Sequence, residues 1–186
     1  MNRRLAGEDF YFLQQVHKTS GVATVTGTMV HPSPRSSHRV PFGTGRAVGD
    51  MLHEGEQRML FYDPMVFSIV GSWLSCVTEN SGADADLLLE TASRRSPLLH
   101  DVLTQAGFAP SWENLKRNSR DTARLLTAFH GWFDAFRTMR LIHELSDRAY
   151  PRISPLEAVA PLLKRAGEIP PDSIAGQLAL LQRLQT

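Results

Sequence analysis

Three dipeptides that join a helix-capping residue to a proline divide the second part of this sequence into helices. Asp63-Pro64, Ser96-Pro97 and Ser154-Pro155 each place a side-chain acceptor immediately before a proline. The acceptor suits the N-cap position, and proline is favoured at the first helical residue because an N–H there would have no partner. Glu157 follows Ser154 at the spacing of a capping box. The pattern predicts a chain that is all-helical after residue 60, apart from loops.

Apolar periodicity between these and other breakers sets the expected helix boundaries. Helices are expected at residues 8–18, 64–79, 84–94, 97–106, 112–148, 155–166 and 172–184. Thr44 is expected to cap a further helix that runs through Val48, Met51, Leu52 and Met59. Pro161 should kink or split the helix at 155–166, because a proline removes one helical hydrogen bond and clashes with the preceding turn. The predicted fold class is mainly α, a multi-helix domain.

The longest expected helix, residues 112–148, carries a stripe at alternating three- and four-residue spacing. Its members are Thr122, Leu125, Phe129, Trp132, Phe136, Met139 and His143, and Leu126, Phe133 and Leu145 widen it. A stripe of this width is typical of a helix face buried in a core. We interpret it as packing rather than as an aromatic cofactor site.

The composition is that of a globular domain. The 186 residues are 42% hydrophobic and 21% charged, enough to build a real core. The net charge is only +1, and too few basic residues interleave with aromatic ones to form a nucleic-acid-binding face. No nucleic-acid partner is expected.

The single cysteine and the longest apolar run bear on the compartment. Cys76 cannot form an intrachain disulfide, which fits a reducing compartment, and we interpret it as a buried thiol rather than a nucleophile. The run at 65–77 is interrupted by serines and Gly71, and it is shorter than the roughly 20 residues that span a bilayer. We expect a core helix there, no transmembrane segment, and a cytoplasmic protein; peripheral association with the inner membrane is left open.

Residues 7–46 have a different character from the rest. Glu8 and Asp9 open an amphipathic helix, where carboxylates are stabilised by the positive end of the helix dipole. The apolar stripe of that helix consists of Phe10, Leu13, Val16 and His17. Gly21 can supply the turn that follows, and the β-branched residues of 22–31 predict a strand.

A basic loop completes this segment. Pro32, Pro34 and Pro41, with Gly43 and Gly45, exclude regular structure after the strand. Residues 1–46 carry six Lys and Arg against two acidic residues, a local charge of +4, whereas the remainder carries −3. The local excess suits an anionic ligand.

The order of these motifs resembles the C-terminal part of bacterial family 2 glycosyltransferases. The motifs that carry the resemblance are GEDFYFL at 7–13, HPSPRSSHRVPFGTGRAV at 31–48, FDAFRTMRLIHELSD at 133–147 and YPRISPLEAV at 150–159. Such enzymes are inverting, use nucleotide-sugar donors and have the GT-A fold. The resemblance implies that residues 1–48 are the end of a GT-A catalytic domain, whose helix, strand and loop complete its sheet. Residues 49–186 would form a helical region packed with it as one domain.

The resemblance implies a catalytic role for the acidic pair. Asp9 would be the general base that deprotonates the acceptor hydroxyl, which a carboxylate can do when it lies within hydrogen-bond reach of that oxygen. Glu8 would orient Asp9 or bind the acceptor. The alternative is an ordinary acidic first turn that only stabilises the helix.

The basic loop would bind the diphosphate of the donor. The guanidinium groups of Arg35, Arg39 and Arg46 can pair with phosphate oxygens in a bidentate manner as the leaving group gains negative charge. The backbone N–H groups of Gly43, Thr44 and Gly45, at the start of a helix, suit the same anion. The alternative is a solvated basic loop with ordinary turn glycines.

A divalent cation, Mn²⁺ or Mg²⁺, accompanies the diphosphate in many GT-A enzymes. His31 or His38 could be an additional ligand for it, although neither has a carboxylate nearby in the sequence, and the alternative is a structural or surface histidine. The other histidines are interpreted as structural: His17, His53, His100, His130 and His143. No cofactor is expected for this chain by itself.

The sequence departs from the family ahead of Glu8. It contains neither the nucleotide-binding half of a GT-A enzyme nor the Asp-x-Asp metal motif that precedes the acidic pair. Asp84-Ala85-Asp86 comes after the pair, and we interpret it as a helix-capping turn. The expectation is a split or truncated enzyme that transfers sugar from a nucleotide-sugar donor to an acceptor hydroxyl only with a nucleotide-binding partner chain.

Two further expectations concern association. A strand at 22–31 would have unpaired edges, so we expect a homodimer or other homo-oligomer in which it pairs between copies, or a partner chain that covers it. The alternative function is a non-catalytic helical module that acts through protein–protein interaction.

Overall fold

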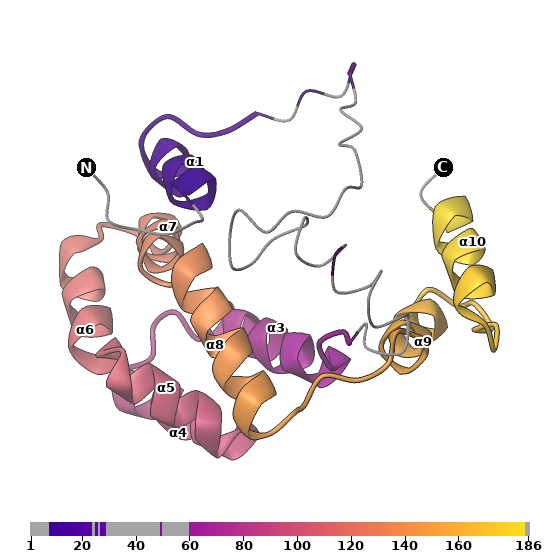
Figure 1. Ribbon diagram of the computed structural model, residues 1–186. Helices are drawn as coiled ribbons and strands as arrows, with labels where there is room; N and C mark the ends of the chain where they lie inside the picture. The colour runs from indigo at the N-terminus through magenta and orange to yellow at the C-terminus, as the bar shows by residue number, and fades with distance from the viewer. Residues whose placement is uncertain (1–7, 24, 26, 29–48, 50–59, 185–186) are drawn as a thin grey trace. The chain divides into compact units, whose positions relative to one another are not determined.

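The structure is a computed structural model that describes residues 8–23, 25, 27–28, 49 and 60–184 (Figure 1). The chain divides into two compact units, Met1–Met59 and Leu60–Thr186. The fold is mainly helical, as predicted, and in the described part the one β-type pairing is an isolated antiparallel bridge between Phe61 and Ile153. No helix among the described residues is long and apolar enough to cross a membrane.

The first unit contains helix α1, Glu8–Thr19, which agrees with the expected helix at 8–18. Gly21 follows it with φ +77°, a left-handed conformation that glycine adopts readily, and closes the helix as predicted. The expected strand at 22–31 is wrong where it is described, since residues 22, 23, 25, 27 and 28 are not in a strand. Gly49 is helical, and the other residues of the helix expected at 44–59 lie outside the described ranges.

The second unit confirms the helix starts that the capping dipeptides predict. Asp63, Ser96 and Ser154 are N-caps, and each side chain accepts a backbone N–H of the first turn. Ser154 and Glu157 form the complete capping box. The helices with these and neighbouring starts are α3 Pro64–Glu79, α4 Ala85–Arg95, α5 Pro97–Gln105, α9 Pro155–Arg165 and α10 Ile174–Leu184. Helix α9 continues through Pro161, so the expected split does not occur.

The prediction of a single long helix at 112–148 is wrong. Three helices occupy this region, α6 Phe108–Asn118, α7 Thr122–Trp132 and α8 Ala135–Arg148. Asp121 and Asp134 cap the second and third, accepting N–H bonds from Arg124 at 2.8 Å and from Phe136 and Arg137 at 3.1 Å. A capping aspartate offers the backbone an alternative to continuing the helix, and here it starts a new one.

The two breaks change which residues are buried after residue 133. The predicted stripe holds in α7, where Leu125 and Phe129 are buried. In α8 the predicted stripe residues Phe136 and Met139 are 48% and 43% exposed, Leu145 is buried as predicted, and Leu141, which was not predicted, is buried as well. The apolar periodicity therefore continues in the sequence from α7 into α8, although the two helices are separated by a break at residues 133–134.

An aromatic cluster around Trp73 of α3 forms the centre of the second unit. The Trp73 ring is 1% exposed and makes edge-to-face contacts with Phe108, Phe129 and Phe133, with centroids 5.1, 6.2 and 6.5 Å away. Such pairs contribute about 0.5–1.5 kcal/mol each beyond the burial of area. The contacts join α3 to α6, α7 and the residue that ends α7.

Polar side chains of α6 hold the turn between α3 and α4. The Trp112 indole N–H donates to the Ala83 carbonyl at 3.0 Å, and the Lys116 ammonium donates to the same carbonyl at 2.9 Å. Glu113 accepts the Ala85 N–H at 3.2 Å. These bonds satisfy backbone groups at the start of α4, so they fix the position of α4 relative to α6.

Substituting Trp73 should therefore be costly. We expect Trp73→Ala to lower the free energy of unfolding by about 3–5 kcal/mol, since it removes a large buried ring and leaves a cavity. Phe67→Ala is the matched control, an aromatic residue of the same helix that is 51% exposed, and it should cost less than about 1 kcal/mol. Urea unfolding followed by circular dichroism measures both. Equal costs for the two variants would contradict this description of the core.

Candidate functional site

The residues predicted to carry chemistry fall in the first unit. Glu8 and Asp9 are the first two residues of α1, so the acidic pair stands at the N-terminal end of that helix, as expected. The loop and metal candidates lie outside the described residues: His31, Arg35, His38, Arg39, Gly43, Thr44, Gly45 and Arg46. Their roles stay predictions.

Helix α1 exposes apolar side chains close to the acidic pair. Phe12 and Leu13 come three and four residues after Asp9 in the sequence. Phe12 is 66% exposed and Leu13 is 51% exposed. Of the stripe expected for this helix, Phe10 and Val16 are half-buried whereas Leu13 and His17 are exposed. Helix α1 thus carries exposed apolar side chains in the part of its sequence that follows the acidic pair.

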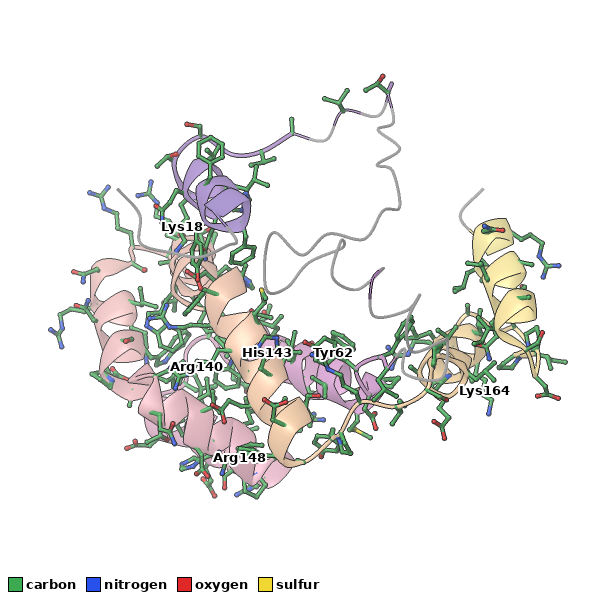
Figure 2. All side chains as sticks on the ribbon, viewed as in Figure 1. Lys18, Tyr62, Arg140, His143, Arg148 and Lys164 are labelled. Atoms are coloured by element: carbon green, nitrogen blue, oxygen red, sulfur yellow. The ribbon has the colours of Figure 1, made fainter. Side chains whose placement is uncertain are left out.

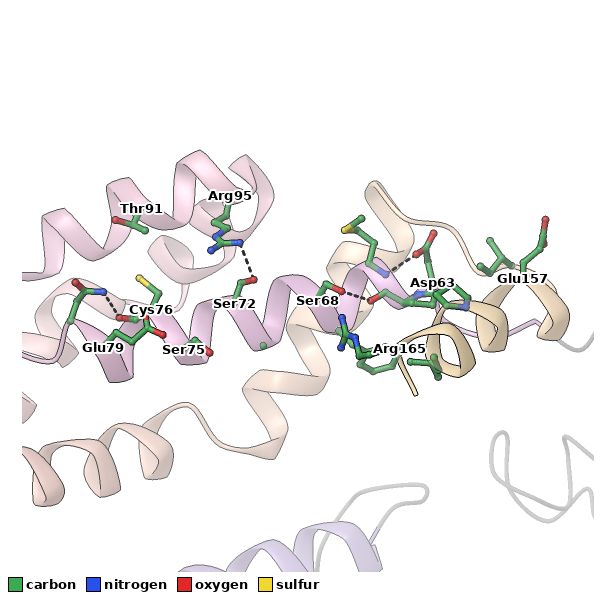
Figure 3. Close-up of a pocket in the computed structure, with 18 residues that line it drawn as sticks. Asp63, Ser68, Ser72, Ser75, Cys76, Glu79, Thr91, Arg95, Glu157 and Arg165 are labelled. Atoms are coloured by element: carbon green, nitrogen blue, oxygen red, sulfur yellow. Dashed lines mark hydrogen bonds between the residues drawn. The ribbon is translucent and has the colours of Figure 1, made fainter. Parts of the chain in front are cut away.

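The second unit contains a groove of about 880 Å³ along one face of α3 (Figure 3). Small side chains of α3 form its floor, and α4 and α9 contribute to its lining. The floor residues are Ser68, Gly71, Ser72, Ser75 and Cys76; the residues from the other two helices include Thr91, Arg95, Glu157, Pro161, Leu162 and Arg165. The groove is therefore polar along its floor, with apolar groups such as Leu162 at its edge.

The charged groups of the groove have defined partners at several positions. The Arg95 guanidinium donates to the Ser72 hydroxyl at 3.1 Å, which joins the end of α4 to the middle of α3. Asp63 accepts the Met65 N–H at 2.8 Å as the cap of α3. The Ser154 hydroxyl and then its N–H lower the pKa of Glu157 by donating to that carboxylate. The acidic groups at the α9 end are thus occupied in helix caps.

Cys76 lies in the groove as a half-buried free thiol. Burial raises the pKa of this thiol, since the thiolate loses solvation. The nearby positive charge of Arg95 opposes that change, and the negative charge of Glu79 adds to it. A thiol with a raised pKa is a weak nucleophile at neutral pH. The thiol was predicted to be buried, and the structure has it half-buried.

The described histidines and acidic residues do not form a metal site. No group of three His, Cys, Asp or Glu side chains within the described ranges could hold an ion. His143 is stacked on Tyr62 with ring centroids 6.1 Å apart (Figure 2), and His130 lies against Phe129. Asp84 is the N-cap of α4 and accepts the Leu87 N–H at 2.9 Å, which confirms the capping interpretation of Asp84-Ala85-Asp86.

Comparison with protein families, with curated proteins and with solved structures finds no match to this chain. Any assignment of a protein class to this chain must therefore be argued from its residues and their geometry.

Sequence reasoning did not predict the groove, although one signal for it was present. The serines and Gly71 that interrupt the apolar run at 65–77 are spaced so that Ser68, Ser72 and Ser75 recur along one side of α3. That spacing predicts a face of small polar residues. The walls come from residues far away in the sequence, Arg95 and Arg165 among them, so periodicity alone could not reveal a groove.

The charges around Cys76 give a test of this local geometry. Arg95→Met should raise the pKa of Cys76 further, and Glu79→Gln should lower it, because each removes one of the two opposing charges. The pH profile of iodoacetamide alkylation should accordingly shift upward in the first variant and downward in the second. The control is Arg94→Met, which should leave the profile unchanged. It removes the neighbouring exposed arginine, which pairs with Glu90. Shifts of the same sign for Arg95→Met and Glu79→Gln would refute the arrangement.

Proposed function

We propose that this chain belongs to an inverting glycosyltransferase that uses a nucleotide-sugar donor. Its chemistry resides in residues 7–46, and the helical unit forms the C-terminal region of the enzyme. The observation that carries the proposal is that α1 begins at Glu8, so the acidic pair opens a helix and is followed in sequence by the Arg- and Gly-rich loop.

The reaction is a single displacement. Asp9 takes the proton of the acceptor hydroxyl as its oxygen attacks the anomeric carbon, and the bond from that carbon to the nucleoside diphosphate breaks on the opposite face. The electron pair of the broken bond leaves with the diphosphate, whose growing charge Arg35, Arg39 and Arg46 neutralise. Inversion at the anomeric carbon follows from attack on the face opposite the leaving group.

The proposal requires a nucleotide-binding surface in addition to residues 7–46. The family implies that a GT-A half supplies it and that Mn²⁺ or Mg²⁺ accompanies the diphosphate. The described residues hold no set of ligands that fits such an ion, so no step of the reaction is assigned to a metal.

Substituting the base gives the first test. In the chain combined with its nucleotide-binding half, we expect Asp9→Asn to lower kcat by about 100-fold or more, because a positioned general base contributes about that much, while the Kd of the donor changes little. Asp86→Asn is the matched control, since Asp86 is likewise the second residue of its helix but lies in α4. Release of nucleoside diphosphate measures turnover. A donor Kd that rises as much as kcat falls would contradict the role of Asp9.

Nucleotide binding gives a second test. Calorimetry of the whole chain with millimolar nucleoside diphosphates and Mn²⁺ should detect weak binding that Arg39→Ala weakens further. Arg140→Ala, which removes an exposed arginine of α8, should leave it unchanged. Absence of any binding by the unaltered chain would remove the loop from the active site.

A non-catalytic interaction module is the second candidate function. The observation in its favour is the groove along α3, whose edge carries exposed apolar side chains, among them Met65, Phe67 and Leu162. The two functions differ in their dependence on Asp9: a module that acts through its helical surface keeps its full function in Asp9→Asn.

A further inference from the structure

Helices α9 and α10 form a pair with a small core of their own. The main cluster of buried side chains extends from Val66 to Leu145, and the buried residues Ala158, Leu163 and Leu180 of the pair are not members of it. The buried amide of Gln177 donates to two backbone carbonyls within the pair, those of Leu156 at 3.3 Å and Pro171 at 3.1 Å. Arg183 pairs with Glu168 at 3.3 Å.

The tight turn between the two helices also belongs to the pair. A Cβ at Gly176 would lie 2.7 Å from the Pro171 Cβ, closer than real Cβ contacts, so the start of α10 packs directly on the preceding loop. The hydrogen bonds, the ion pair and this contact are all internal. They make α9, the loop and α10 one body.

The segment that leads into α9 makes hydrogen bonds to the residues just before α3. Among the described residues, these bonds come from Arg152 and Ile153. Ile153 and Phe61 exchange two backbone hydrogen bonds of 2.9 and 2.8 Å. The Arg152 guanidinium donates to the Tyr62 hydroxyl at 3.0 Å and lies 4.4 Å from the centre of its ring. We call these two contacts the latch.

A short segment connects the latch to the main body. The Tyr150 N–H donates to the Leu145 carbonyl at 2.8 Å, and the Tyr150 side chain packs against the main cluster, so this residue is anchored. Ser154 caps α9 and moves with it. Residues 151–153 are all that lies between the two anchors, and the latch holds two of them.

We propose that α9 and α10 act as a strap, in which α9 forms one wall of the groove over α3 and the pair opens as a unit about residues 151–153. Opening breaks the latch and the packing of α9 on α3 but leaves the cluster around Trp73 intact. Segments with few contacts to the main core open at a lower free energy than the core itself. In Figure 1 the pair lies at the end of the unit where α3 begins. Its opening widens the groove along Ser68 and Ser72.

Native-state hydrogen exchange of the full chain tests the strap. Amides of α9 and α10 should exchange together, through one opening reaction, and at least tenfold faster than the slowest amides of α3 and α7 at neutral pH. Arg152→Ala should accelerate exchange in α9 and α10 a further fivefold or so, because it removes a hydrogen bond and a cation–π contact, and should leave α3 to α8 unchanged. Lys164→Ala, which alters an exposed side chain of α9 outside the latch, is the control and should change neither.

A covalent latch gives an independent check. Hydrogen-bonded antiparallel pairs have Cα atoms about 5.5 Å apart, within the range that a disulfide bridges. In a chain carrying Phe61→Cys, Ile153→Cys and Cys76→Ser, oxidation should slow exchange in α9 and α10, and reduction should restore it. The proposal is overturned if α9 and α10 exchange at the same rate as α3 and α7 in the unaltered chain. It is also overturned if Arg152→Ala or the oxidised disulfide changes exchange equally throughout the unit.

Discussion

Burial of the Trp73 ring among aromatic side chains is the interaction on which the helical unit depends. Phe108, Phe129 and Phe133 come from a stretch that the chain reaches only after α4 and α5, so the contacts close a long loop of sequence onto α3. Because short helices are marginal in water by themselves, these helices of nine to sixteen residues need such packing to persist. The Trp73 indole nitrogen has no hydrogen-bond partner within the described structure, a cost of about 1–3 kcal/mol that the aromatic contacts must offset.

The residues proposed to carry chemistry and the residues of the aromatic core fall in different units of the chain. The acidic pair and the basic loop belong to the first unit, and the aromatic core belongs to the second. The second unit has its own surface feature in the groove along α3. The proposed strap makes the width of that groove adjustable without disturbing the core, because the hydrogen bonds of the latch among the described residues join it to Phe61 and Tyr62, which are not members of the buried cluster.

The starts of helices could be predicted wherever a cap and a proline coincide, because both act through the backbone of the first turn. Asp63-Pro64 gives the start of α3 as it is found, and Ser154 with Glu157 gives the capping box. The breaks before α7 and α8 were missed, since an aspartate without a proline is compatible with a continuing helix until tertiary packing favours the cap. In α8, burial was then wrongly assigned to Phe136 and Met139, although it was correctly assigned to Leu145.

The candidate site shows the same limit. The position of Glu8 and Asp9 at a helix start follows from local signals and was predicted, whereas the groove requires α3, α4 and α9 to come together. Periodicity along α3 could indicate its small-residue face but not the residues opposite it. The proposed function therefore rests on the motif in residues 7–46 and not on the groove.

The most direct test of the proposed site is to measure hydrogen exchange of the full chain with and without a nucleoside diphosphate, and to find which residues the nucleotide protects. With Mn²⁺ and millimolar UDP, GDP, ADP or dTDP, at least one should slow exchange in residues 31–46 and in the first turn of α1 and leave α3, α4 and α9 unchanged. Protection confined to the groove along α3, or no protection with any of the four, would contradict the assignment of the chemistry to the first unit.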